Sequence, residues 1–294
     1  MFDFLINFYG GYEYLFFNIA INVLLAMSMY ITLSAGTFIL AHGALMAVGA
    51  YVSAIITIKL GATLFLSLAG GIVAALIVAI IITKPALRLA GFYLAIATIA
   101  LGEAVRYTAL NLSITGGALG LKGIPQNAKM WHLLLAIGIF IYLFFRIERS
   151  RKGRAFSGIR NDEVASSAIG IDIEHYRMLA IIISAVILAV AGALEAHHTF
   201  FVAPDHFGLE KLIHMLSFCV IGGIKKFWGP IAGAVILTVL PEFLRPIGEH
   251  TPLFVSIVML GVILFMPNGI FFSGFPKIHS FFRKGTMGKE SYNK

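Results

Sequence analysis

The sequence predicts an all-α, polytopic membrane protein with about nine transmembrane helices, within a range of about eight to ten. Of its 294 residues, 59% are hydrophobic and only 12% are charged, whereas soluble domains carry about 25% charged residues. The hydrophobic residues also come in successive runs of about 20, the length of a helix that crosses a bilayer. Composition and run length together argue against a soluble domain.

The apolar runs define the expected spans. The first thirteen residues hold Asp3 and Glu13 but no Lys or Arg, which is unlike a signal peptide, so the first run is expected to stay in the membrane. We expect one transmembrane domain over residues 1–276 and a basic, disordered cytoplasmic tail over 277–294. The spans fall approximately at residues 14–33, 38–57, 62–82, 92–112, 130–146, 176–197, 209–224, 228–246 and 252–270.

The basic residues predict the orientation. Sixteen of the 22 lie in four segments between or after the spans. Seven fall in residues 146–177, five in the tail, and the others are Lys84, Arg88, Lys225 and Lys226. With nine spans these segments share one side of the membrane, which the positive-inside rule assigns to the cytoplasm. The positive-inside distribution then accounts for the net charge of +8, and we expect no nucleic-acid partner.

Small residues and prolines indicate close packing and interrupted helices. Gly192 with Ala196, and Gly229 with Gly233, stand four residues apart, a spacing that lets helix backbones approach closely in lipid. Prolines such as Pro85 break or end the spans. Broken helices at membrane depth are tolerated where they line a cavity.

The polar run 146–177 contains a short predicted helix. Asn161 can cap it, two acidic residues follow in its first turn, and Gly170 is a typical stop. A helix over 162–169 would be about 12 Å long.

One face of this short helix would be apolar, with Val164 and Ala168 four residues apart. Such a face suits docking into a groove on a soluble partner. An ordinary solvated basic loop is the alternative, and spacing alone favours neither.

Glu103 and Arg106 lie three residues apart inside an expected span. Ionisable residues there are costly and normally face the bundle or a wet cavity, often as a pair. They are either part of a solute pathway or a structural pair near the outer membrane face.

Four histidines lie near the outer ends of two spans, close to Asp205 and Glu210. They are His197, His198, His206 and His214. They could be drawn as a metal site, but no two have the zincin spacing, and we favour interfacial or vestibule-lining residues. The chain has no P-loop and no Gly-x-Ser-x-Gly motif, so we expect no catalytic residue, metal or other cofactor.

Most of the chain resembles one transporter family. Residues 149–155 and 159–171 resemble the cytoplasmic coupling loop of branched-chain amino acid ABC transporter permeases, and in particular of the M-type subunit of the leucine/isoleucine/valine uptake system. Further similar motifs follow in the family's order. They begin at Ser34, Arg88, Thr115, Ala189, Phe201, Ile221, Leu240 and Pro267.

The resemblance implies a permease subunit of the bacterial cytoplasmic (inner) membrane. It would pair with a second, H-type permease, dock two ATP-binding cassette ATPase subunits that carry the ATP chemistry, and receive solute from a periplasmic binding protein. The helix at 162–169 would be the coupling helix. The residues implied in coupling are Arg154, Arg160, Asp162, Glu163, Val164, Ala168 and Gly170. The candidate pathway residues are Ser34, His42, Glu103, Arg106, Thr115 and Gly116.

The chain departs from the family pattern at three points. The interval from Glu163 to Gly170 is one residue longer than in the importer motif Glu-Ala-Ala-x-x-x-Gly, with Val164 in the place of its first Ala. A loop expected to be mostly neutral carries Lys225 and Lys226, and His197-His198 occupies a helix end that is usually less polar. The alternatives are a permease for urea or short amides, a secondary carrier, and a membrane enzyme using the histidines.

Overall fold

The computed structural model describes residues 2–89, 91–244, 251–265 and 269, and these are predominantly helical. A helix occupies each of the nine predicted spans, which confirms the all-α fold class. They are α1 (Phe2–Ser34), α2 (His42–Leu60), α3 (Leu64–Ala86), α4 (Phe92–Asn111), α5 (Met130–Glu148), α8 (Ile173–Thr199), α9 (Leu209–Gly222), α10 (Trp228–Phe243) and α11 (Thr251–Phe265).

Five helices in the described part of the chain are long and apolar enough to cross a membrane. They are the Tyr12–Ser34 part of α1, together with α2, α3, α5 and α8. Helix α10 is apolar but shorter. The protein is therefore a multi-pass membrane protein, and the count of nine crossings stays a prediction.

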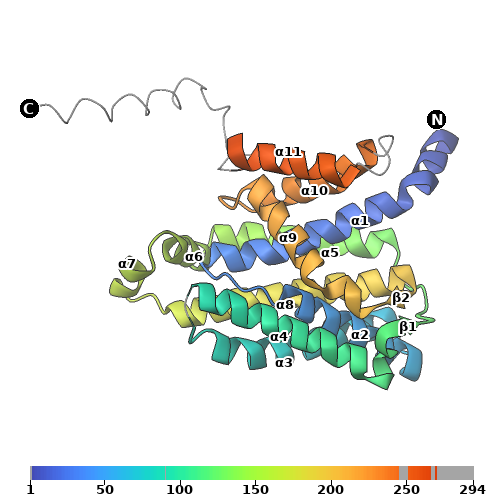
Figure 1. The fold of residues 1–294 in the computed structure, drawn as a ribbon, viewed down its shortest axis with the longest axis horizontal. Coiled ribbons are helices and arrows are strands. Elements are labelled where there is room, and N and C mark those ends of the chain that lie inside the picture. The colour runs from blue at the N-terminus through green and yellow to red at the C-terminus, as the bar shows by residue number, and fades with distance from the viewer. Residues whose placement is uncertain (1, 90, 245–250, 266–268, 270–294) are drawn as a thin grey trace, which may run out of the picture.

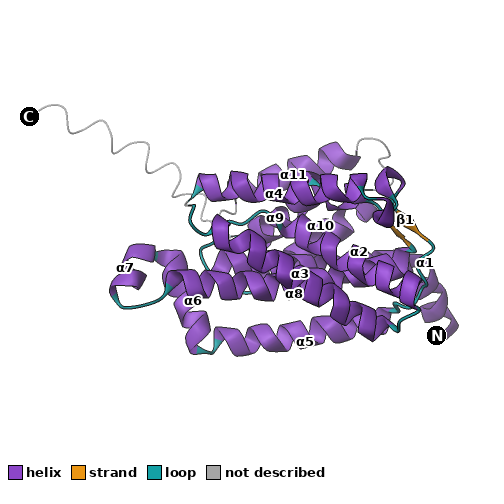
Figure 2. Cartoon of the chain, turned by 90° about the horizontal axis from the view of Figure 1, so that it is seen from below, coloured by secondary structure: helices purple, strands orange, loops and turns teal. Residues whose placement is uncertain are grey.

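The two ends of the helix bundle carry different structures (Figures 1 and 2). Helices α6 (Arg151–Asn161) and α7 (Glu163–Ala168) lie at one end. The opposite end carries the N-terminus and the antiparallel strands β1 (Leu121–Lys122) and β2 (Phe201–Val202), in which Leu121 pairs with Val202. Three short 3-10 helices complete the described chain: η1 (Ser113–Thr115), η2 (Gly117–Leu119) and η3 (Pro204–Phe207). The predicted tail over 277–294 lies outside the described residues.

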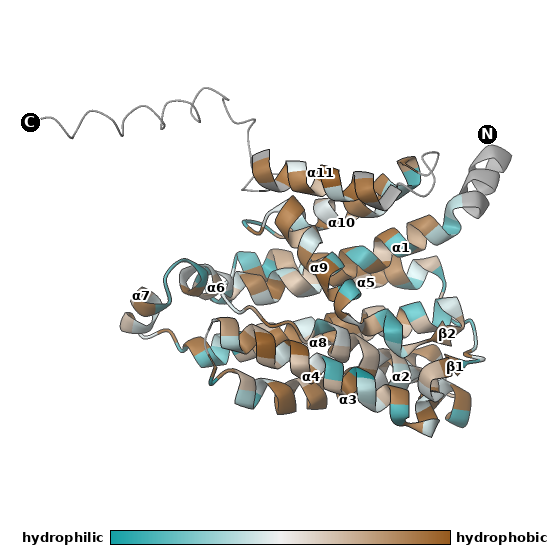
Figure 3. Cartoon of the chain, in the orientation of Figure 1, coloured by the Kyte–Doolittle hydropathy of each residue, from teal (hydrophilic) through white to brown (hydrophobic). Residues whose placement is uncertain are grey.

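Hydropathy follows this division. Helices α3 and α11 are largely hydrophobic in Figure 3, whereas hydrophilic stretches lie around α6. Many large apolar side chains of α3 and α5 are exposed, among them Phe65, Ile81 and Leu134. Exposed apolar surface of this extent on helices of spanning length is what a lipid environment requires.

Helix α2 packs against α3 and α8 through glycines. A Cβ atom placed on Gly49 would lie 2.4 Å from Ala189 Cα, and one on Gly192 would lie 2.4 Å from the Met46 carbonyl oxygen. On the other side of α2, a Cβ on Gly71 would lie 2.7 Å from the Gly49 carbonyl oxygen. The three backbones approach so closely because these positions have no side chain.

A break in the helices lies between α1 and α2, in a segment without proline, whereas interruptions were predicted at prolines. The predicted second span began at residue 38, but residues 37–41 have no helical structure and α2 begins only at His42. Ile39 and Ala41 are buried there, and the Leu40 amide donates a 3.0 Å hydrogen bond to Thr98 Oγ1 of α4. A non-helical backbone inside a bundle needs such partners, because lipid supplies none.

Candidate functional site

The segment before the predicted coupling helix is itself a helix, α6, which the charged sequence did not indicate. Ser150 caps it by accepting hydrogen bonds from the amides of Lys152 and Gly153. Phe156 and Ile159 are buried against the bundle. Packing of these two side chains on the bundle therefore holds a helix in a run of basic residues.

The predicted coupling helix is present as α7, with six residues instead of eight. Its N-cap is Asp162 and not Asn161, because the Asp162 carboxylate accepts a 2.9 Å hydrogen bond from the Ala165 amide. Gly170 follows the C-cap with φ +83°, a left-handed conformation that favours glycine.

Helix α7 presents an apolar surface away from the bundle. Ser166 is its buried residue, whereas Val164 and the following Ile169 are 79% and 78% exposed. Ala165 and Ala168 are exposed as well. Four apolar residues are therefore exposed in α7 and at its C-cap.

Ion pairing fixes α7 to the bundle. Arg177, at the start of α8, donates a 2.7 Å hydrogen bond from Nη2 to Glu163 Oε2. The same nitrogen lies 3.4 Å from the carbonyl oxygen of Gly36, just beyond α1. Arg177 thus links α7 to the ends of α1 and α8.

Arg160 and Arg154 take different positions on α6. Arg160 donates a 2.6 Å hydrogen bond to the carbonyl oxygen of Ile224, in the loop between α9 and α10. Arg154 is exposed. Of the seven residues predicted for coupling, Arg160 and Glu163 therefore contact other segments, whereas Arg154 and Val164 face outward.

The predicted pathway residues Ser34 and His42 lie on either side of the break between α1 and α2. The Ser34 hydroxyl donates to the Ile31 carbonyl at 2.8 Å. His42 is buried, with Nε2 at 3.4 Å from Thr32 Oγ1. Its Nδ1 has no hydrogen-bond partner among the described residues. Such an unpaired ring nitrogen is uncommon, because buried polar groups nearly always have a hydrogen-bond partner.

Glu103 and Arg106 form the expected pair, and a third group joins them. Arg106 Nε lies 2.7 Å from Glu103 Oε2, and its Nη1 lies 2.9 Å from Asp205 Oδ1 in η3. The network ties α4 to the segment between β2 and α9. Among the described residues it forms no hydrogen bond or ion pair with His42, although Glu103 lines a small pocket together with Leu40, Gly43 and Ala44 next to that histidine.

Mutations of Asp205 and of Arg106 should change the free energy of unfolding by different amounts. Asp205 is 78% exposed, so Asp205→Asn should change the free energy of unfolding by no more than about 0.5 kcal/mol. Arg106→Gln removes the partner of both carboxylates and should cost about 1 kcal/mol. Thermal unfolding in detergent measures both. Equal effects of the two variants would contradict the assigned geometry.

Thr115 and Gly116 lie in the turn after α4. The Thr115 hydroxyl lies 2.6 Å from the Ala109 carbonyl oxygen and 2.7 Å from that of Leu112. A Cβ on Gly116 would lie 2.1 Å from the Gly120 carbonyl oxygen. Both residues therefore shape the turn that leads to β1, at the end of the bundle opposite α7.

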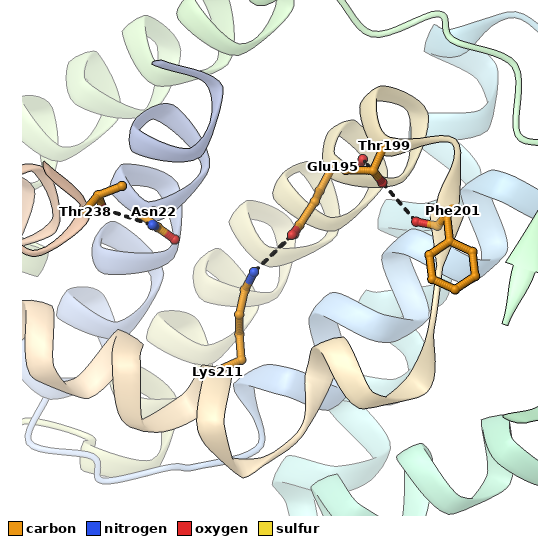
Figure 4. A network of polar contacts seen from close by, with 6 residues as sticks. All are labelled: Asn22, Glu195, Thr199, Phe201, Lys211 and Thr238. Carbon is orange, nitrogen blue, oxygen red and sulfur yellow. Dashed lines mark hydrogen bonds and ion pairs between the residues drawn. The ribbon is translucent and has the colours of Figure 1, made fainter. Parts of the chain in front are cut away.

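The structure also shows a charged pair that sequence reasoning missed. Glu195 of α8 and Lys211 of α9 point toward each other (Figure 4), with Lys211 Nζ 3.0 Å from Glu195 Oε1. Nearby, Asn22 of α1 donates a 2.9 Å hydrogen bond to Thr238 Oγ1 of α10. The available signal was that both ions lie in expected spans, where an ionisable residue needs a partner.

The four histidines do not gather. His197 is buried, with its ring nitrogens 2.9 Å from Thr57 Oγ1 and 2.8 Å from the Ala193 carbonyl oxygen. The His198 ring stacks on Phe17 at 3.5 Å between centroids. His206 meets the ring of Phe201 edge-on. In the part of the chain that the structure describes, no three His, Cys, Asp or Glu side chains are placed to hold a metal ion.

The spanning helices define a multi-pass membrane protein. A family described as "Branched-chain amino acid transport system / permease component" matches residues 11–267. The chain belongs to this family, and it is a permease component of an ABC transport system.

Relatives of this chain serve more than one transport system. The high-affinity branched-chain amino acid transport system permease protein LivM of Salmonella typhimurium is 29% identical, over 87% of this chain and 67% of the relative. The autoinducer 2 import system permease protein LsrC of an Enterobacter species is 28% identical, over 56% of this chain and 53% of the relative.

A solved structure shares the fold. It is PsaBC from Streptococcus pneumoniae in complex with a Fab, with a TM-score of 0.51 at 16% identity, covering 97% of this chain and all of the matched chain. At this identity the likeness is one of fold alone.

Proposed function

We propose that the chain forms the solute pathway of an importer for branched-chain or related amino acids in the bacterial cytoplasmic membrane. It pairs with a second, H-type permease and receives solute from a periplasmic binding protein. Two ATPase subunits, which carry all the ATP chemistry, dock at α7 and its counterpart. A permease for urea or short amides is the alternative within the same mechanism.

The exposed surface of α7 carries this proposal. Val164, Ala165, Ala168 and Ile169 form an apolar surface on a helix of six residues, and the Arg177–Glu163 ion pair of 2.7 Å fixes that helix to α8. Movement of a docked ATPase would reach the bundle through α7. Coupling of this kind needs different contacts in two states.

Val164→Asp and Ala168→Asp should uncouple ATP hydrolysis from uptake. An unpaired charge in a buried contact costs a few kcal/mol, so ATP-driven uptake should fall at least about tenfold. The chain should still insert, because both side chains are exposed. Uptake of radiolabelled leucine into proteoliposomes that hold the assembled complex measures the effect.

Val164→Leu is the matched control, since it keeps the surface apolar, and it should retain uptake. Normal uptake and solute-stimulated ATPase activity in both aspartate variants would contradict the assignment of α7. Uptake that persists after ATP depletion would favour a secondary carrier. Competition of leucine uptake by valine, urea and acetamide separates the two solute classes.

A further inference from the structure

A pocket opens beside α6, between the ends of α1 and α5 and the loop joining α9 to α10. Its volume is about 220 Å³. Apolar side chains and cations share its wall, and they include Tyr30, Phe144, Phe156, Arg160, Lys225 and Lys226. Two of these, Lys225 and Lys226, are the cations that depart from the family pattern, and neither coupling nor a solute pathway accounts for them.

The pocket has an excess of positive charge. Its carboxylate, Glu148, already accepts hydrogen bonds from the Tyr30 hydroxyl and the Phe227 amide, each at 3.2 Å. Lys225 and Lys226 are exposed, and among the described residues neither forms an ion pair. With Arg160, three cations therefore face one carboxylate that is already hydrogen-bonded. This arrangement favours an anionic ligand.

Polar and apolar side chains both line the pocket, and its aromatic side chains Tyr30, Phe144 and Phe156 are buried. The ring of Phe144 packs against those of Tyr30 and Phe227, with centroids 5.8 and 6.0 Å apart. Trp228, at the first position of α10, is 44% exposed beside the lysines. Tryptophan at a helix end is typical of the level of the lipid headgroups.

Three cations beside the ends of the apolar helices α1 and α5 match the phosphate of an anionic phospholipid. The phosphate would meet Arg160, Lys225 and Lys226. Basic pockets between transmembrane helices bind lipid headgroups by this chemistry. We propose that the pocket binds the phosphate headgroup of an anionic phospholipid from the leaflet on the α6 side.

Quenching of tryptophan fluorescence tests the proposal on the full chain. The sequence holds two tryptophans, so Trp131→Phe leaves Trp228, two residues after Lys226, as the sole reporter. The purified chain is reconstituted in phosphatidylcholine bilayers that contain brominated phosphatidylglycerol or brominated phosphatidylcholine. Trp228 should be quenched preferentially by the brominated phosphatidylglycerol.

Lys225→Gln combined with Lys226→Gln should reduce that preference on the order of tenfold, because each basic residue near an anionic surface contributes measurably to binding. The fold should persist, since both side chains are exposed. The matched control is Lys84→Gln with Arg88→Gln, which removes two exposed cations that do not line the pocket. It should leave the preference unchanged.

Three results would overturn the proposal. The first is equal quenching by the two brominated lipids. The second is loss of the preference when millimolar inorganic phosphate replaces chloride at matched ionic strength, which would assign the pocket to a soluble phosphate. The third is an unchanged preference in the Lys225 and Lys226 variant, and reduced co-purification of ATPase subunits with that variant would assign the two lysines to the ATPase.

Discussion

Leucine in place of Gly49 or Gly192 is expected to prevent the chain from reaching a stable fold. Each Cβ would lie 2.4 Å from backbone atoms of the facing helix, so α2 and α8 would have to move apart. Overpacking of a core typically costs about 1–3 kcal/mol, and displacement of whole helices exceeds that range. The yield of monodisperse protein and its unfolding temperature in detergent measure the loss.

Alanine at the same positions is the milder form of this test. Gly192→Ala should lower stability by about 2–3 kcal/mol, because even one methyl group meets backbone and not a flexible side chain. Gly138→Ala in α5 is the matched control, since nothing lies within 4 Å of a Cβ there. It should be neutral or slightly stabilising, as alanine favours helix more than glycine does. Equal effects at Gly138 and Gly192 would contradict the close approach of α2 and α8.

Removal of one partner from the Glu195–Lys211 pair is the second large expected effect. The two side chains are only 22% and 23% exposed, so either ion left alone would be poorly solvated. Breaking a fully buried pair costs about 3–5 kcal/mol, and partial exposure reduces this to about 2–3 kcal/mol. Glu195→Gln and Lys211→Met should each lower the unfolding temperature accordingly.

The combined variants separate pairing from other roles of these residues. The double substitution Glu195→Gln with Lys211→Met should be less destabilising than the sum of the single changes, because no ion is left unpaired. The charge exchange Glu195→Lys with Lys211→Glu should recover part of the stability. Additive single effects would show that the pair contributes nothing as a pair.

The fold class and the positions of the helices followed from the hydrophobic runs. A run of about 20 apolar residues has few alternatives to a spanning helix, so a helix lies in each predicted span. Helix α6 was missed because its sequence is mostly basic and polar. Burial of Phe156 and Ile159 against other elements stabilises it, and pairing of that kind is not visible in local sequence.

The candidate site was predicted only in part. The capping residues of α7 are local signals, and Gly170 ends the helix as its sequence indicates. The Glu103–Arg106 pair is local as well, at three residues apart. By contrast, Lys211 meets Glu195 across 16 residues, and Arg160 meets the Ile224 carbonyl across 64. Such partners depend on how the helices pack, which the sequence pattern does not specify.

The non-helical segment 37–41 has a consequence for the order in which the chain assembles during synthesis. The Leu40 amide is satisfied by Thr98, 58 residues further along the chain. A peptide group left without a partner in lipid costs several kcal/mol. When only α1 and α2 have left the ribosome, Thr98 has not yet been made, so the segment cannot yet adopt its final conformation. The first four helices are therefore expected to pack together as one cooperative unit, after α4 has entered the bilayer.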